Sequence, residues 1–146
     1  MKSLRLFLPL LLLAGVVTDA HAADRAAVQA ILITASNEPG QTDPRLARYE
    51  PTLRRILRFE SYRFVGQGSA ALAVPGDGVI NLGQGQRLEI SAAEPARGLR
   101  LRVAWKQDGQ TLIETGLSLR PGAPAVLGGP ATGQGEEVYA IILTGG

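Results

Sequence analysis

The chain has 146 residues, with 15 Lys or Arg, 13 Asp or Glu, one His and no Cys. This length suffices for one domain with its own core, and the near balance of charge argues against nucleic acid as a partner. The only His and the only Met, His21 and Met1, lie within the first 22 residues, so a chain cleaved after Ala22 lacks imidazole and thiolate groups. We therefore expect no cofactor, no metal site and no His- or Cys-dependent catalytic centre.

The first 22 residues have the order of a secretory signal peptide. Lys2 and Arg5 precede an apolar run that ends at Val17, and Ala20-His21-Ala22 follows as an A-x-A cleavage site. The run is shorter than the ~20 residues that a membrane-spanning helix needs. We expect a periplasmic or secreted chain, residues 23–146, that forms a single β-rich domain without a transmembrane segment.

The first elements expected in this domain are a strand and a helical segment. Residues 26–35 are apolar and β-branched enough for a buried strand, and residues 36–44 are rich in turn formers. Asp43 and Pro44 are an N-cap and a first helical residue. Pro51 interrupts the apolar helical stripe that follows, which predicts two short helical pieces or one kinked helix over residues 44–58. The stripe consists of Leu46, Tyr49, Leu53, Ile56 and Leu57.

After Phe59 the apolar pattern changes to the period of two that is typical of strands. Strands are predicted over residues 61–66, 69–74, 78–82, 86–92, 99–106, 111–119, 125–129 and 137–144. Glycine-rich turns, among them 76–78 and 83–85, separate these strands, and residues 130–136 are expected to form a loop. The short spacing between turns favours a mainly β (α+β) fold, either an antiparallel β-sandwich or a small barrel, with one N-terminal helical segment.

A group of arginines around the helical segment is the principal candidate binding surface. Six of them stand between residues 45 and 63 against only Glu50 and Glu60. Guanidinium groups bind carboxylates and phosphates in bidentate fashion, so this surface fits an anion or an acidic partner, although it also fits a solvated helix face. The six candidates are Arg45, Arg48, Arg54, Arg55, Arg58 and Arg63.

Three weaker candidates come from the strands. Arg100, Arg102 and Lys106 alternate along one strand and form a second basic strip, which fits an outer sheet face or an edge. Trp105 is in phase with the apolar residues of that strand, which predicts a core position and not a carbohydrate platform. Glu114 is the acid with the most apolar neighbours. It alternates with the apolar residues of its strand, however, which predicts that its side chain faces water.

These observations favour an exported, non-catalytic module of the bacterial envelope that binds a protein partner or takes part in an assembly or secretion complex. Contact is expected through the six arginines or through an exposed sheet edge. Binding of an anionic glycan or lipid is one alternative. A small hydrolase or lyase that uses carboxylates is another, since glycoside hydrolysis needs only two acids at a defined separation.

The position of the cleavage site gives a direct prediction. The exported chain is expected to begin at Ala23, which intact-mass measurement of the protein recovered from outside the cytoplasm will check. A chain recovered there with its first 22 residues attached would contradict the signal-peptide assignment.

Overall fold

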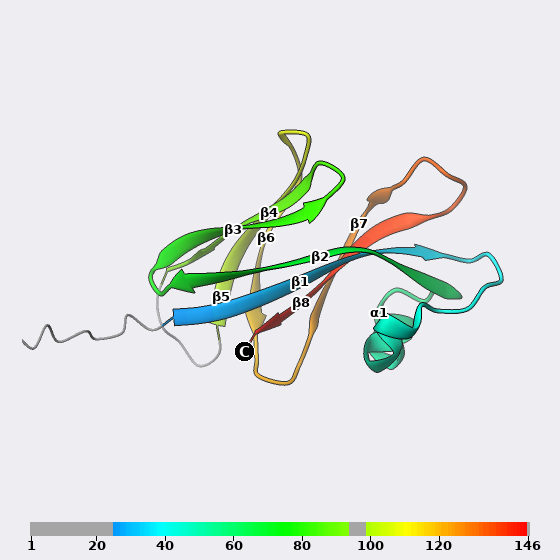
Figure 1. Ribbon diagram of the computed structural model, residues 1–146, viewed down its shortest axis with the longest axis horizontal. Helices are drawn as coiled ribbons and strands as arrows, with labels where there is room; N and C mark the ends of the chain where they lie inside the picture. The colour runs from blue at the N-terminus through cyan, green and yellow to red at the C-terminus, as the bar shows by residue number, and fades with distance from the viewer. Residues whose placement is uncertain (1–24, 94–98, 146) are drawn as a thin grey trace, which may run out of the picture.

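The computed structural model describes residues 25–93 and 99–145, which form two antiparallel β-sheets and a short helical segment (Figure 1). The expected signal peptide, residues 1–22, lies outside the described residues. The strands are β1 (Arg25–Ser36), β2 (Ser61–Ala73), β3 (Gly76–Gly83), β4 (Gln86–Ala92), β5 (Leu99–Gln107), β6 (Gln110–Leu119), β7 (Ala125–Ala131) and β8 (Val138–Gly145). The helical segment consists of the 3₁₀ helix η1 (Pro44–Tyr49) and the α-helix α1 (Glu50–Ile56).

Each sheet has four strands, with the order β2-β1-β8-β7 in sheet A and β3-β4-β5-β6 in sheet B. All the pairings within the two sheets are antiparallel. The mainly β class is thereby confirmed. The two separate sheets make the fold a sandwich and not a single closed barrel.

The main core lies between the two sheets, where alternate side chains from each sheet meet. Strand β5 shows the alternation most clearly, because Leu101, Val103 and Trp105 are buried whereas Arg100 and Arg102 are exposed. Burial of each such large apolar side chain contributes about 1.5–3 kcal/mol relative to its exposure. Sheet A supplies the facing members, among them Val28, Leu32, Ile141 and Leu143.

Strand β1 is buried on both of its faces, because the helical segment covers the outer face of sheet A. Val28 and Leu32 point into the main core, whereas Ile33 and Ala35 point to a second cluster beneath the helical segment. The other fully buried members of this second cluster are Leu46, Leu53, Tyr62 and Ala140. The near-continuous apolar sequence of β1 follows from this double burial.

Two prolines define the helical segment. Pro44 begins η1 directly after Asp43, which caps it, and Pro51 lies in the first turn of α1, where its missing N–H removes no helical hydrogen bond. Of the two predicted forms, two short helical pieces or one kinked helix, the structure shows the first, although α1 ends at Ile56 and not at Arg58.

The two sheets approach most closely where β2 meets β3. A Cβ atom at Gly66 would collide with the Leu82 carbonyl oxygen, and one at Gly68 would lie 2.5 Å from the Asn81 carbonyl oxygen. Only glycine permits this backbone-to-backbone contact. We call this side of the sandwich, formed by β2 and β3, the closed margin.

On the opposite side, Trp105 spans the space between the sheets. Its indole N–H donates a buried hydrogen bond of 2.6 Å to Oε1 of Gln86 on β4. The far edge of its ring lies directly against Gly129 of β7, where any Cβ would overlap the ring. The predicted core position of Trp105 is confirmed, and the indole sets the distance between β5 and β7.

Several sequence-based boundaries were wrong. Residues 61–66 and 69–74 belong to one strand, β2, and residues 76–78 lie within β3 because the chain turns earlier, at Val74-Pro75. Strand β7 extends to Ala131, into the stretch predicted as a loop. Ile56, predicted in the helical stripe, is 48% exposed, whereas Leu53 and Leu57 pack in the second cluster.

The closed margin predicts a strong contrast between two glycine substitutions. Gly66→Ala should lower the free energy of unfolding by about 2 kcal/mol, because β2 or β3 must shift to accept the methyl group. Gly116→Ala, at an open position on β6 where the nearest atom to a new Cβ is 3.8 Å away, should change it by less than about 1 kcal/mol. Urea denaturation of both variants will check this, and equal losses would contradict the assignment of a tight margin.

Candidate functional site

Asp43 holds Arg45 at the start of the helical segment. The Asp43 carboxylate accepts hydrogen bonds from the backbone N–H of Arg45 at 2.9 Å and from its guanidinium at 2.8 and 3.1 Å. The same guanidinium lies over the ring of Phe64, 3.9 Å from its centroid. These hydrogen bonds, with that from the Arg45 side chain as the largest cause, lower the pKa of Asp43 to about 2. The Arg45 side chain therefore makes local structural contacts, with Asp43 and Phe64.

Arg54 is held in the same way at the other end of the segment. Its guanidinium donates to Oε1 of Glu50, one helical turn away, with the atoms 2.9 and 3.0 Å apart. It also donates to the backbone carbonyl of Glu60 at 3.0 Å, which links α1 to the start of β2. Arg54 thus fastens the helical segment to sheet A.

The remaining four arginines are exposed but do not form one surface. Arg48, Arg55 and Arg58 belong to the helical segment or its end. Arg63 lies on the face of β2 opposite Tyr62, which packs beneath the helical segment. The structure therefore separates Arg63 from the others and leaves three exposed arginines on the helical segment.

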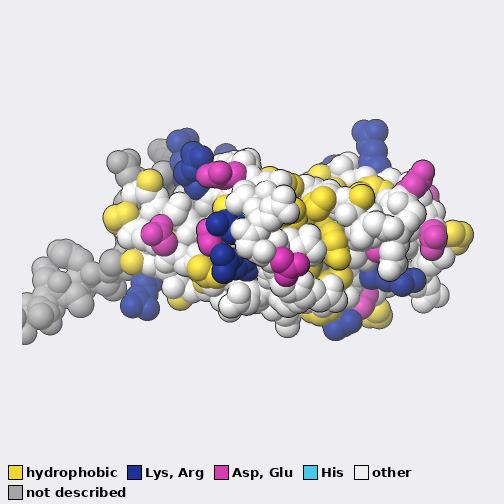
Figure 2. All heavy atoms as spheres, turned by 90° about the horizontal axis from the view of Figure 1, so that it is seen from above, with side chains coloured by type: hydrophobic (Ala, Val, Ile, Leu, Met, Phe, Trp, Pro, Cys, Tyr) yellow, Lys and Arg dark blue, Asp and Glu magenta, His cyan; other side chains and the backbone are white. Residues whose placement is uncertain are grey.

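Four acidic side chains of the described residues form ion pairs: Asp43, Glu50, Glu89 and Glu114. Glu114 is exposed, as its parity predicted, and lies 3.8 Å from Arg102. Within residues 25–93 and 99–145, no group of three or more acidic, His or Cys side chains is arranged to hold a metal ion. Figure 2 shows acidic and basic side chains interspersed on the face seen from above, with apolar side chains exposed between them.

The outer face of sheet B, turned away from sheet A, carries a more organised set of charges. Residues of neighbouring strands stand opposite one another in rows, and one such row runs Asp77, Ser91, Arg102 and Gly116 across the four strands. The next row towards the turn after β5 contains Glu89 and Glu114. The basic strip predicted on β5 therefore lies in the middle of a sheet face and not at an edge.

This face divides into two halves with different electrostatics. In one half, Glu89 forms ion pairs of 3.2 Å with both Arg87 and Lys106. In the other half, Arg100 and Arg102 stand between strands that carry small residues at the facing positions. These small residues are Ser91 on β4, and Gly116 and Ser118 on β6, with Ala93 directly after β4.

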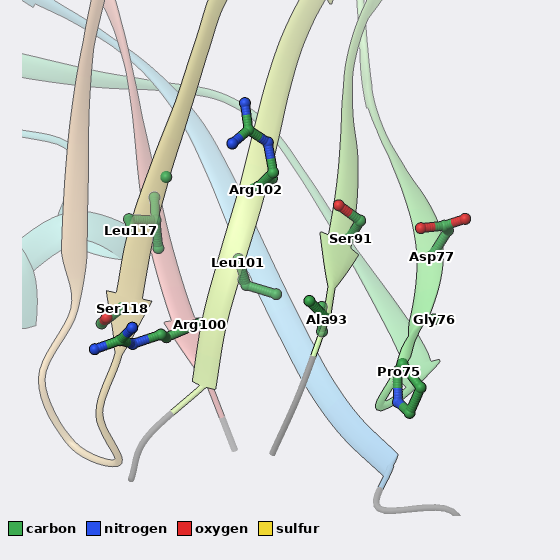
Figure 3. A pocket seen from close by; sticks show the side chains of 12 residues that line it. Pro75, Gly76, Asp77, Ser91, Ala93, Arg100, Leu101, Arg102, Leu117 and Ser118 are labelled. Carbon is green, nitrogen blue, oxygen red and sulfur yellow. The ribbon is translucent and has the colours of Figure 1, made fainter. Parts of the chain in front are cut away.

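A shallow hollow of about 740 Å³ lies over this second half. Figure 3 shows Arg100 and Arg102 projecting from β5, with Arg100 directed over β6 beside Ser118. The hollow exists because the residues that flank both arginines have short side chains and leave the space above them empty. The hollow therefore offers the guanidinium of Arg100, and that of Arg102 beside its ion pair with Glu114, to an anion that approaches from solvent or from the side of β6, while Asp77 lines the far side.

The hollow adjoins the open margin, which we define as the side of the sandwich formed by β6 and β7. In the described part of the chain, β6 pairs with β5 alone, so its other side presents unpaired backbone groups. Its inward side chains Ile113 and Leu117 are only partly buried, whereas their β5 partners Trp105 and Leu101 are buried. Apolar surface and a free strand edge therefore coincide at β6.

The two strands of the open margin differ in how their edges are protected. Strand β7 carries Pro130, which has no N–H to donate, and its pairing with β8 is irregular between Gly128 and Ala131. Strand β6 has no proline and only one charged residue, Glu114, and its pairing with β5 is irregular only near its start, between Thr111 and Ile113. Of the two edges, β6 is the one able to accept another strand.

The residues of this site could be recognised in part from the sequence. The alternation of Arg100 and Arg102 was apparent, and the absence of proline from residues 110–119 was a signal for an unprotected strand. The position of β6 at an edge, and of Gly116 and Ser118 beside the arginines, depends on the pairing of the strands.

Comparison of the chain with models of protein families, with curated proteins and with solved structures finds no significant match. Neither η1 nor α1, the helices of the described residues, has the length and apolar character needed to cross a membrane. The site is therefore interpreted from its geometry.

The contact between Asp43 and Arg45 predicts a dependence on pH. Because the pKa of Asp43 falls from 3.8 to about 2 on folding, its stabilisation is complete above pH 3.8 and is lost as the pH falls towards 2. NMR titration should give a carboxyl midpoint near 2 in the natural chain, and Arg45→Gln should return it towards 3.8. An unchanged midpoint in that variant would show that Arg45 is not the cause.

Proposed function

We propose that this protein is an exported, non-catalytic module of the bacterial envelope that binds a protein partner through its open margin. The observation that carries this proposal is the unpaired edge of β6, which is flanked by the partly exposed apolar side chains of Ile113 and Leu117. Such an edge gives affinity through main-chain hydrogen bonds and gives specificity through the side chains beside it.

The contrast between the two margins supports this proposal. The closed margin is sealed by contact of β2 with β3 at Gly66 and Gly68, so nothing can be added there without separating the sheets. At the open margin, β7 is protected by Pro130 but β6 is not. Natural β-proteins usually protect long edge strands with charges, prolines or bulges. The regularly paired part of β6, residues 113–119, has one charged residue and no proline, an exception that binding would explain.

Binding of an anionic glycan or lipid is the second candidate function. The hollow beside Arg100 and Arg102 supports it, and the exposed Arg48, Arg55 and Arg58 of the helical segment offer a second surface for the same chemistry. Both surfaces would bind more weakly as salt screens the charges. The carboxylate-dependent hydrolase or lyase has less support, because Glu89 and Glu114 lie in ion pairs on an exposed face and not in an apolar cleft.

Site-specific photo-crosslinking in the bacterium that produces the protein tests partner binding. A benzoylphenylalanine at position 117, in place of Leu117, is expected to crosslink to a second protein because this side chain faces the open margin. The matched control replaces Val79, which is 50% exposed on β3 near the closed margin, and should give no such adduct. Equal crosslinking from both positions, or none from position 117, would contradict the proposal.

A further inference from the structure

We propose that the partner binds as an extended strand that adds to β6 and carries acidic side chains opposite Gly116 and Ser118, with apolar side chains between them. This inference rests on the proposed function and adds the chemistry of the bound segment. It follows from the positions of the β6 side chains relative to those of β5.

The inward face of β6 determines the apolar positions of the added strand. Ile113, Thr115, Leu117 and Leu119 point towards the core, opposite the inward residues of β5. Ile113, Thr115 and Leu117 are only partly buried, so apolar residues on an added strand would cover surface that the protein itself leaves accessible.

The outward face of β6 determines the acidic positions. Gly116 stands opposite Arg102 and Ser118 opposite Arg100, so β6 itself places nothing large beside either guanidinium. An added strand would lie about 9.5 Å from β5, two strand spacings away, a distance that an arginine and a glutamate side chain span together. Arg100 already extends over β6 towards this edge (Figure 3).

Glu114 limits where the acids can stand. It is the next outward residue along β6 and lies 3.8 Å from Arg102, so a third acid opposite Glu114 would meet a like charge. A basic residue is favoured there instead. For an antiparallel strand, the preferred order from its N-terminus is therefore acidic, apolar, acidic, apolar, basic.

A synthetic peptide of this pattern tests the inference directly. The probe is acetyl-Val-Glu-Val-Glu-Val-Lys-Val-amide, with fluorescein attached through a linker, and the control is its charge-inverted form, Val-Lys-Val-Lys-Val-Glu-Val. Fluorescence anisotropy should show tighter binding of the acidic probe, and binding should weaken as NaCl is raised. Hydrogen exchange should slow at the amides of residues 113–119 when the probe is bound.

Variants of the protein identify the groups responsible. The double variant Arg100→Gln with Arg102→Gln should weaken binding of the acidic probe about tenfold and reduce its dependence on salt. Arg87→Gln is the matched control, since Arg87 lies on the same sheet face but is paired with Glu89, and it should bind the probe as the natural chain does. Unchanged urea midpoints will show that the variants are folded.

The outcomes separate this inference from the proposed function. Equal binding of the two peptides, no binding of either, or an unaffected double variant would overturn the acidic strand. If position 117 still crosslinks to a second protein in those cases, partner binding at the open margin stands. A dimer in solution with slowed exchange on β6 before any peptide is added would also overturn the inference, because a second copy would then be the occupant.

Discussion

The packing of Trp105 between the sheets is the interaction on which the arrangement of the sandwich depends. Its indole reaches from β5 to the backbone of β7 at Gly129 and is fixed in orientation by Gln86. Glycines at positions 66 and 68 instead let β2 and β3 touch backbone to backbone. The sandwich is therefore held apart on one side and pressed together on the other, which explains why β6 is left with accessible apolar side chains.

The helical segment has a different task from the one its charge suggests. Its apolar residues Leu46 and Leu53 bury the second face of β1, and Arg45 and Arg54 secure it through Asp43, Glu50 and the Glu60 carbonyl. These two arginines thus stabilise the packing of the helical segment against sheet A. On β5, Arg100 and Arg102 lie instead on the outer face of sheet B, beside small residues of the neighbouring strands.

The sequence predicted most of the elements and little of the site. Alternation of apolar residues is a local property, so the strands β5 and β6 and the burial of Trp105 were predicted correctly. The exposure of Ile56 was missed because the helical period does not specify how wide a stripe of α1 the sheet covers. The open edge of β6 could not be predicted, since no local pattern states which strands have a neighbour on both sides.

Pro130 limits how many copies of the protein could assemble through their edge strands. Were β7 as receptive as β6, one copy could offer its β7 to the β6 of the next, and such unlike surfaces build open-ended filaments. The missing N–H of Pro130 and the broken pairing around it make β7 a poor acceptor of a strand. On the proposed function, β6 is then the one receptive edge of this margin, and we expect a one-to-one complex and not a polymer.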